Sequence, residues 1–197
     1  MRKALIALMA AALLAPAAAA RDVGGVDIPE TLRVAGKDLA LNGAGIRTKV
    51  FFKVYAGALY LPGPSSSAAA IVASDGPMAI RLHFLMDVDA KSIQDAWNEG
   101  FRAGSAGSAG SGGSAGSAGS FEAPADKVSR FNACFAEDSR KGTIYDIVYD
   151  PAEGTMVKIN GVVKDVIPGA DFKKAVFAIW LGDKPADKGL KKGLLGG

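Results

Sequence analysis

One stretch, residues 43–61, constrains the fold of this chain more than any other. It begins with the glycine-rich run Gly-Ala-Gly-Ile-Arg and continues as a long apolar and aromatic segment without proline, which ends at Pro-Gly-Pro at residues 62–64. Glycine-rich runs favour turns, and proline-free runs rich in aromatic and β-branched residues favour strands. The sequence therefore predicts a turn at residues 43–47 that leads into a long strand over residues 50–61.

Both faces of the predicted strand are apolar. Side chains on a strand alternate between its two faces, so even-numbered residues from Val50 share one face and odd-numbered residues from Phe51 share the other. Only Lys53 and two tyrosine hydroxyls interrupt the apolar surface. A strand exposed to water on one face would carry a polar residue at nearly every second position, so we expect other elements to cover both faces. The small residues at 56–58 leave room for a closely packed helix or a ligand.

The first 20 residues have the three parts of a secretory signal peptide. Arg2 and Lys3 precede an apolar run at residues 4–14, and a small-residue tract ends with three alanines at residues 18–20. The apolar run is shorter than the roughly 20 residues that a spanning helix needs, and no later segment reaches that length. We therefore expect residues 1–20 to be removed and the mature chain to be periplasmic or secreted. The alternative is an N-terminal membrane anchor that is retained.

Charge and cysteine content narrow the class of protein further. Without residues 1–20 the chain carries 21 basic and 20 acidic side chains, and it has no basic cluster apart from short lysine pairs near its end. This balance argues against a nucleic-acid partner, and we expect no stable membrane insertion of the mature chain. The remaining residues, about 177, suffice for one domain with a substantial core. The single cysteine, Cys134, cannot form an intramolecular disulfide, so packing must supply the stability.

Residues 104–120 contain only Gly, Ser and Ala in a nearly repeating pattern. None of these side chains is large enough to be buried in a core, so the tract predicts a flexible linker. The segments on both sides have helical patterns, and neither part can close a core alone. We therefore interpret the tract as a loop inside a single domain of residues 21–197. Its regularity fits natural low complexity or an engineered replacement of an original loop.

The remaining sequence predicts an α+β fold. Asp89 is a suitable N-cap for a helix with an apolar stripe, and Asn160-Gly161 is a strong hairpin signal. We expect an antiparallel sheet with helices mainly on one face. In chain order, the predicted elements are a hairpin at 31–41, the strand at 50–61, a helix at 66–74, a strand at 78–86, a helix from 89, a helix from 124, strands at 143–149, 155–159 and 162–167, a helix from 171 to 182 and a short lysine-rich helix after 185.

No motif in the sequence indicates a catalytic or metal site. His83 is the only histidine, and no second metal ligand stands at a recognisable spacing from it. Cys134 lacks a partner for nucleophilic catalysis and is best explained as a small core residue. The glycines at 43–45 do not precede a helix that would hold a phosphate. Asp87 and Asp89 are too close together for an acid and base pair and fit helix capping, so we expect no metal, no cofactor and no assigned catalytic residue.

Several segments together carry a family resemblance that covers nearly all of the expected mature chain outside residues 104–120. They are GAGIR at 43–47, FFKVYAGALYL at 51–61, RLHFLMDVD at 81–89, AWNEGF at 96–101, IPGADF at 167–172 and AIWLGD at 178–183. On these residues the chain resembles the chalcone isomerase-like family, in particular its bacterial secreted branch. The resemblance implies an open-faced sandwich, in which a long antiparallel sheet and a helical layer enclose an apolar cleft.

The same resemblance implies two functions, because the family contains plant isomerases that cyclise chalcones to flavanones and non-catalytic members that bind fatty acids. Arg47 matches the arginine that faces the ligand in both branches. Tyr55 stands where the isomerases have a threonine and where the fatty-acid binders use a tyrosine beside that arginine. Ile179 stands where the isomerases carry a hydroxyl-bearing residue. The tyrosine and asparagine of their earlier helix have no clear match among residues 88–95.

Chalcone cyclisation requires several placed hydrogen-bond donors in addition to one cation. Compared with the isomerases, this chain lacks some of the hydrogen-bond donors. It keeps the guanidinium of Arg47 and the phenol of Tyr55, which together suit a carboxylate. We therefore expect a non-catalytic binder of a fatty acid or a similar small hydrophobic ligand. An intramolecular lyase that acts on a flavonoid-like ligand is the alternative, and a structural protein whose cleft is filled by its own side chains is a third. The candidate ligand-binding residues are Arg47, Tyr55, Tyr60, Trp97 and Ile179.

Overall fold

The computed structural model describes residues 19–105 and 121–197. The expected signal peptide lies almost wholly outside the described residues, as does most of the Gly/Ser/Ala tract. The first two residues of that tract, Gly104 and Ser105, are the last two residues of a helix. The elements are β1 (Ala20–Asp22), β2 (Asp27–Pro29), β3 (Thr31–Val34), β4 (Lys37–Lys49), β5 (Phe52–Leu61), α1 (Ala68–Ala73), β6 (Met78–Phe84), α2 (Ala90–Ser105), α3 (Ala125–Ala133), β7 (Ile144–Asp150), β8 (Gly154–Ile159), β9 (Val162–Ile167), α4 (Ala170–Leu181) and α5 (Lys188–Leu194).

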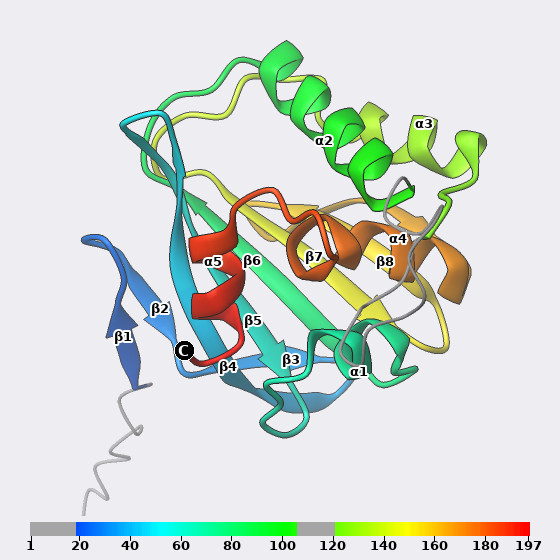
Figure 1. Cartoon of the computed structure of the whole chain (residues 1–197), viewed down its shortest axis with the longest axis horizontal. Coiled ribbons are helices and arrows are strands. Elements are labelled where there is room, and N and C mark those ends of the chain that lie inside the picture. Colours follow the sequence, from blue (N-terminus) through cyan, green and yellow to red (C-terminus); the bar gives the residue numbers. More distant parts are fainter. Residues whose placement is uncertain (1–18, 106–120) are drawn as a thin grey trace, which may run out of the picture.

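The main sheet has seven strands in the order β3-β4-β5-β6-β7-β8-β9, and every neighbouring pair is antiparallel. Spatial order therefore follows chain order, although α2 and α3 stand between β6 and β7 in the chain. The sheet curls, and the helices gather on one of its faces (Figure 1). The predicted α+β class and open-faced sandwich are confirmed.

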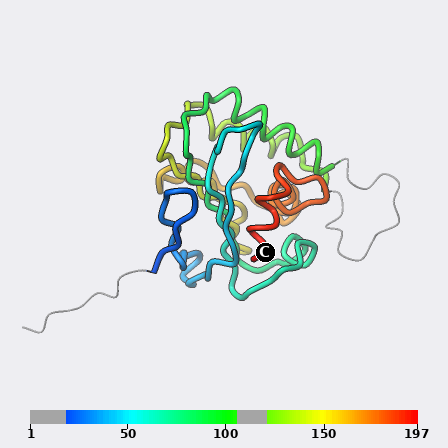
Figure 2. Tube along the Cα trace, turned by 60° about the vertical axis from the view of Figure 1, so that its left-hand side comes forward, coloured from blue at the N-terminus to red at the C-terminus, as the bar shows by residue number. Residues whose placement is uncertain are grey.

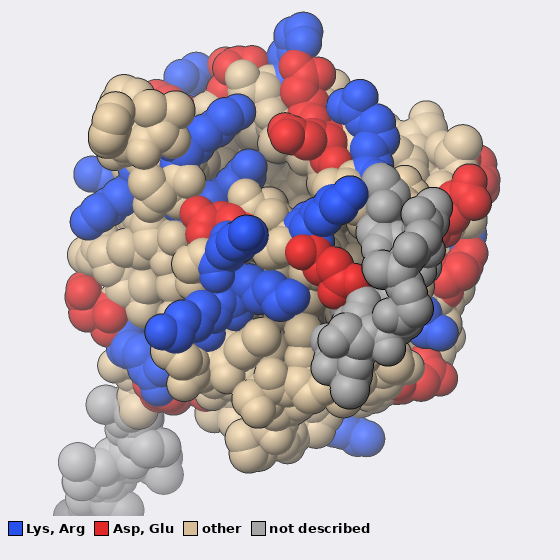
Figure 3. All heavy atoms as spheres, in the orientation of Figure 1, with Lys and Arg blue, Asp and Glu red and all other residues tan. Residues whose placement is uncertain are grey.

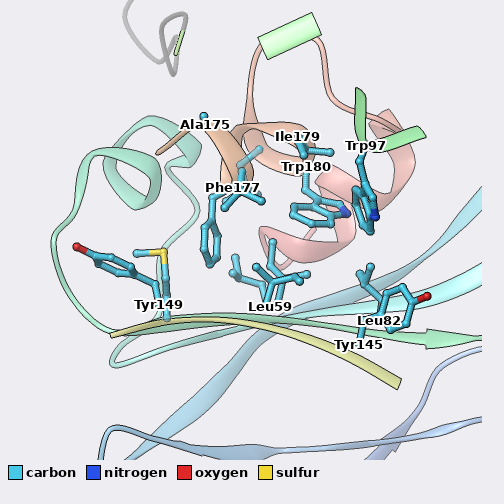
Figure 4. Packing of buried hydrophobic residues seen from close by; sticks show 14 of the residues in the cluster. Leu59, Leu82, Trp97, Tyr145, Tyr149, Ala175, Phe177, Ile179 and Trp180 are labelled. Carbon is cyan, nitrogen blue, oxygen red and sulfur yellow. The ribbon is translucent and has the colours of Figure 1, made fainter. Parts of the chain in front are cut away.

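The larger hydrophobic core lies between the sheet and the helices. Phe177 and Trp180 of α4 point toward Leu59 on the sheet, whereas Ile179 points away from the sheet (Figure 4). α2 packs on α4, and α5 lies over β4 and β5 (Figures 1 and 2). A smaller cluster, which includes Tyr60 and Ile28, covers the other face near β2. The expectation that both faces of the central strand are covered is confirmed for residues 55–61, which are buried, and is wrong for residues 50–53, which are exposed.

A buried lysine joins two of the helices. The Nζ atom of Lys173, in α4, donates hydrogen bonds to the carbonyl oxygens of Val72 at 2.8 Å, Ile71 at 3.3 Å and Ser74, all near the C-terminal end of α1. Burial lowers the pKa of Lys173 to about 8. The three carbonyls accept from the three ammonium donors, so Lys173 still carries its charge at neutral pH although burial disfavours it.

The predicted turn at residues 43–47 is wrong, because β4 runs without a break from Lys37 to Lys49. The chain turns instead at Val50 and Phe51, between Lys49 and its pairing partner Phe52. The glycines of β4 serve a different purpose. A Cβ atom on Gly43 would lie 2.2 Å from the carbonyl oxygen of Gly193 in α5. Glycine at this position therefore permits the close approach of the last helix to the sheet.

The small residues of β5 also make room for α5. A Cβ atom on Gly57 would lie 3.0 Å from Cδ1 of Leu190, which is fully buried against the sheet. The prediction that a helix or a ligand packs closely at residues 56–58 is confirmed for a helix.

A β-bulge interrupts the pairing of β4 with β5. Arg47 pairs with Tyr55, but the next residue, Thr48, pairs with Lys53, which leaves Val54 as the extra residue. Val54 and Tyr55 consequently both pack against the larger core, although strict alternation would put them on opposite faces. The predicted alternation is therefore wrong at this one step.

We expect Gly43→Ala to lower the free energy of unfolding by about 2 kcal/mol or more, because the backbone of α5 would have to move away from β4. The matched control is Gly63→Ala, where a Cβ atom would have no neighbour within 4 Å. Urea unfolding followed by circular dichroism measures both values. Equal stability of the two variants would show that α5 does not depend on the glycine of β4.

Candidate functional site

A cleft of about 330 Å³ lies between the β4–β5 hairpin, the segment after β6 and the first turns of α2. Its inner wall is made by buried side chains and its rim by exposed ones. The surface of the molecule is hollowed between the hairpin and α2 (Figure 3). The lining residues are Tyr55, Phe84, Ile93 and Trp97 within, Lys49, Val50, Phe52, Asp87, Asp89 and Ser92 at the rim, and Arg47, Val54, Met86, Val88 and Ala96 between them.

Local sequence explains how α2 presents its wall of the cleft. The Oδ1 atom of Asp89 accepts a hydrogen bond from the backbone N–H of Ser92 at 2.9 Å, which confirms the predicted N-cap. Val88 is held by two backbone hydrogen bonds to Ser139, each 2.8 Å. Ile93 and Trp97 then follow one turn apart and lie on the same helix face.

Arg47 brings a cation to the cleft. Its Cζ atom lies 5.7 Å from the centre of the Tyr55 ring on the neighbouring strand, and its side chain is half-buried. No carboxylate of residues 19–105 or 121–197 lies within ion-pair distance of it. Asp187 lies close by, but its two oxygens accept hydrogen bonds from the backbone N–H groups of Thr48 and Leu190. The guanidinium therefore remains open to an anion.

Tyr55 places a hydroxyl beside this cation. The residue is 2% exposed, and its hydroxyl accepts a hydrogen bond from the indole N–H of Trp180 at 3.0 Å. Burial raises the pKa of Tyr55 above its usual 10.0, although the nearby positive charge of Arg47 acts in the opposite direction. The phenol consequently stays protonated at neutral pH. Within the described chain no acceptor is found for its hydroxyl proton, so the proton can be donated to a ligand.

Trp97 belongs to the core and to the cleft wall at once. Its ring meets that of Trp180 edge to face at 5.6 Å and that of Phe131 at 5.5 Å. The buried indole N–H of Trp97 has no hydrogen-bond acceptor in the described part of the protein. An unpaired buried donor is uncommon and is compatible with a ligand atom or water in the cleft.

The structure brings three of the five sequence-predicted residues together, namely Arg47, Tyr55 and Trp97. Tyr60 lies on the opposite face of the sheet, where its hydroxyl donates to the carbonyl of Pro29 at 2.9 Å. It stands five residues after Tyr55 on one strand, and this odd spacing sends the two side chains to opposite faces.

Ile179 also lies outside the cleft. Its side chain would be only 2.8 Å from a Cβ atom on Gly100, so it fills the contact between α4 and α2. Val50 and Phe52 at the rim are candidates that the sequence does not single out, because an unbroken apolar run is also typical of a buried strand.

The acidic residues at the rim already accept hydrogen bonds from neighbouring groups. Asp87 accepts hydrogen bonds from the backbone N–H of Lys141 at 2.7 Å and from Arg140 at 3.3 Å, and these contacts lower its pKa. The pKa of Asp89 is lowered mainly by hydrogen bonds from Ser92. Both carboxylates are therefore ionised structural groups at neutral pH, in agreement with the predicted capping role of Asp89.

Other reactive groups lie elsewhere in the described chain. His83 is on β6 opposite Ile144, and burial followed by the charge of Arg81 lowers its pKa. Burial raises the pKa of the Cys134 thiol to about 11. In the described ranges, no group of three or more potential ligand side chains is placed to hold a metal ion. No helix there combines the length and apolar character needed to cross a bilayer.

Comparison with known proteins agrees with this architecture. A family model described as chalcone isomerase-like matches residues 20–196. The crystal structure of a fatty-acid binding protein from Arabidopsis thaliana is similar in fold, with a TM-score of 0.64 and 17% sequence identity over 87% of this chain and 92% of that chain. A sequence comparison with curated proteins found no match. Because the family model spans almost the entire length, this chain belongs to the chalcone isomerase-like family.

Proposed function

We propose that this protein binds a small hydrophobic carboxylate of the fatty-acid type in its cleft and releases it unchanged. The observation that carries the proposal is the half-buried Arg47, which has no carboxylate partner in the described chain and lies over the ring of Tyr55. A guanidinium fork and a phenol hydroxyl are both donors, and together they suit the two oxygens of one carboxylate. The apolar walls would hold the hydrocarbon part.

The size of the cleft favours a ligand with a hydrocarbon chain of medium length. Its volume of about 330 Å³ is at the lower end of the range of about 300 to 1,000 Å³ that is usual for small-molecule sites. The inner wall of Phe84, Ile93 and Trp97 belongs to the packed core and limits further depth. The fatty-acid binding of the Arabidopsis protein with a similar fold supports the class of ligand. We therefore take dodecanoate as the probe.

The residues of the cleft favour binding over chalcone cyclisation. The donors near its inner end are Arg47, the Tyr55 hydroxyl and the Trp97 indole N–H, and Ile179 is apolar and faces α2. A developing enolate requires further placed donors. The histidine of this chain lies outside the cleft, and the rim carboxylates have other partners.

We also propose that the protein acts in the periplasm or outside the cell. The support is the sequence of residues 1–20 alone, whose basic start, apolar run and alanine tract are typical of a signal peptide. N-terminal sequencing of the protein from its natural cells tests this, and a retained Met1 would contradict it.

We expect Arg47→Gln to weaken dodecanoate binding about ten- to hundred-fold, because a charge-assisted pair of hydrogen bonds is lost. Tyr55→Phe should weaken it about ten-fold, since one hydrogen bond from the phenol to the charged carboxylate is lost. Isothermal titration calorimetry measures both affinities. The control is Arg33→Gln, which removes an exposed arginine that pairs with Asp38 at 3.1 Å on β4. Unchanged affinity in Arg47→Gln would refute the site.

We expect dodecanoate affinity to be constant from about pH 6 to pH 10 and to fall below about pH 5. Burial holds the pKa of Tyr55 above 10.0, so its hydroxyl keeps its proton in that range. The fall at low pH arises because a carboxylic acid gains its proton near pH 4 to 5 and loses the charge that Arg47 recognises. Dodecanol, which has no charge to lose, is the control ligand. Equal affinity for dodecanoate at pH 4 and pH 7 would show that the carboxylate is not recognised.

We expect the purified protein to leave the cyclisation of a hydroxychalcone at its spontaneous rate. The loss of chalcone absorbance, followed with protein and with buffer alone, measures this. An excess rate that disappears in Arg47→Gln would establish the isomerase alternative and contradict the non-catalytic proposal.

A further inference from the structure

The tip of the β4–β5 hairpin is the most exposed apolar part of the described protein. We use the term hairpin tip for residues 49–53. Within it Val50 is 77% exposed, Phe51 90% and Phe52 64%. Single apolar side chains on a surface are ordinary, but three consecutive large ones on a projecting turn are not. In the space-filling view the hairpin tip forms an uncharged projection with basic side chains around its base (Figure 3).

The turn itself is unfavourable for its residues. Two-residue hairpin turns favour Asn and Gly because their central residues take positive φ angles. The turn at Asn160 and Gly161 follows this rule, with φ angles of 50° and 80°. Val50 instead adopts a φ angle of 59°, which a β-branched residue rarely does. The hairpin tip therefore exposes apolar side chains and also strains the backbone, which the demands of folding do not explain.

Basic residues flank the apolar turn. Lys49 and Lys53 stand on either side of it, both exposed and without an ion-pair partner in residues 19–105 and 121–197. The nearby carboxylates already accept hydrogen bonds: Asp187 from the backbone N–H groups of Thr48 and Leu190, and Asp87 and Asp89 at the cleft rim from those of Lys141 and Ser92. The hairpin tip therefore has an apolar end and a positively charged base.

We propose that the hairpin tip docks on the surface of an anionic lipid bilayer, with the two phenylalanines among the upper acyl chains and the two lysines at the lipid headgroups. Aromatic side chains favour the membrane interface, and lysine stems can lie along apolar surface while their ammonium groups contact anionic lipids. Three apolar residues bury too little area for permanent insertion, so docking is reversible.

Docking would place the mouth of the cleft at the membrane. Lys49, Val50 and Phe52 belong to the hairpin tip and also line the cleft. A hydrophobic acid could then pass between bilayer and cleft with little exposure to water. This consequence rests on the proposed function, whereas docking itself does not.

Co-sedimentation with vesicles tests the docking, using protein purified from cells that express the full chain. Vesicles of equimolar phosphatidylcholine and phosphatidylglycerol should bind wild-type protein, and vesicles of phosphatidylcholine alone should bind it less. Phe51→Glu should reduce the partition coefficient at least about ten-fold, because a charge replaces the aromatic anchor. Lys53→Glu should reduce it about five-fold or more on the anionic vesicles only, and added salt should do the same.

Two controls match these changes. Lys37→Glu reverses a charge at the first residue of β4, at the opposite end of that strand from the hairpin tip. Val162→Glu replaces another exposed apolar residue, which is 61% exposed on β9. Both should bind vesicles as the wild type does. Equal binding by Phe51→Glu and wild type, or no binding by wild type, would overturn the proposal.

Two further measurements separate the remaining outcomes. Analytical ultracentrifugation detects association between copies of the chain. If the wild type forms a dimer but does not bind vesicles, and the dimer is lost in Phe51→Glu, the hairpin tip serves self-association instead. Phe51 does not line the cleft, so dodecanoate affinity and melting temperature should be unchanged in this variant. Vesicle binding without dodecanoate binding in the wild type would leave docking standing and refute the ligand proposal.

Discussion

The close contact between α5 and the glycines of β4 determines how the hairpin is held. Asn42 donates from its side-chain amide to the carbonyl of Leu194 at the end of α5, at 2.8 Å, and Asp187 caps the start of the same helix. The second oxygen of Asp187 accepts from the backbone N–H of Thr48 at 3.0 Å. The helix is therefore fixed to β4 at both of its ends. This contact supports the hairpin up to Thr48 and leaves the hairpin tip exposed beside the cleft.

The bulge at Val54 and the pairing of Arg47 with Tyr55 convert this scaffold into a site. Without the extra residue, Val54 would face away from Tyr55, and the cleft would lose one apolar wall. Trp180 holds the Tyr55 hydroxyl from the core side, so the hydroxyl proton is directed away from that indole. The arrangement sets two donors side by side in apolar surroundings, where an electrostatic contact is stronger than in water.

Periodicity predicted most of the fold, including the antiparallel strands and the capped helix at Asp89, because burial on one face imposes a repeat on the sequence. It failed at residues 43–47, since glycine permits either a turn or a close approach and the sequence does not distinguish them. The true turn at Val50 and Phe51 carries no turn residues at all. Arg47 and Tyr55 were predicted as site residues from the family resemblance and not from periodicity. Ile179 lies outside the cleft because of how α4 is rotated against α2, and no local sequence pattern predicts that rotation.

Net charge and local charge give different expectations for this protein. The balance of 21 basic and 20 acidic side chains in residues 21–197 predicts no attraction to a membrane. At physiological ionic strength, however, charges are screened beyond about 8 Å, so a surface responds mainly to the residues that contact it. The hairpin holds Lys49 and Lys53 on either side of an exposed apolar turn, and the carboxylates nearest to it already accept hydrogen bonds from backbone N–H groups. A nearly neutral protein can thus present one strongly amphipathic point, and the strained φ angle of Val50 lies at that point.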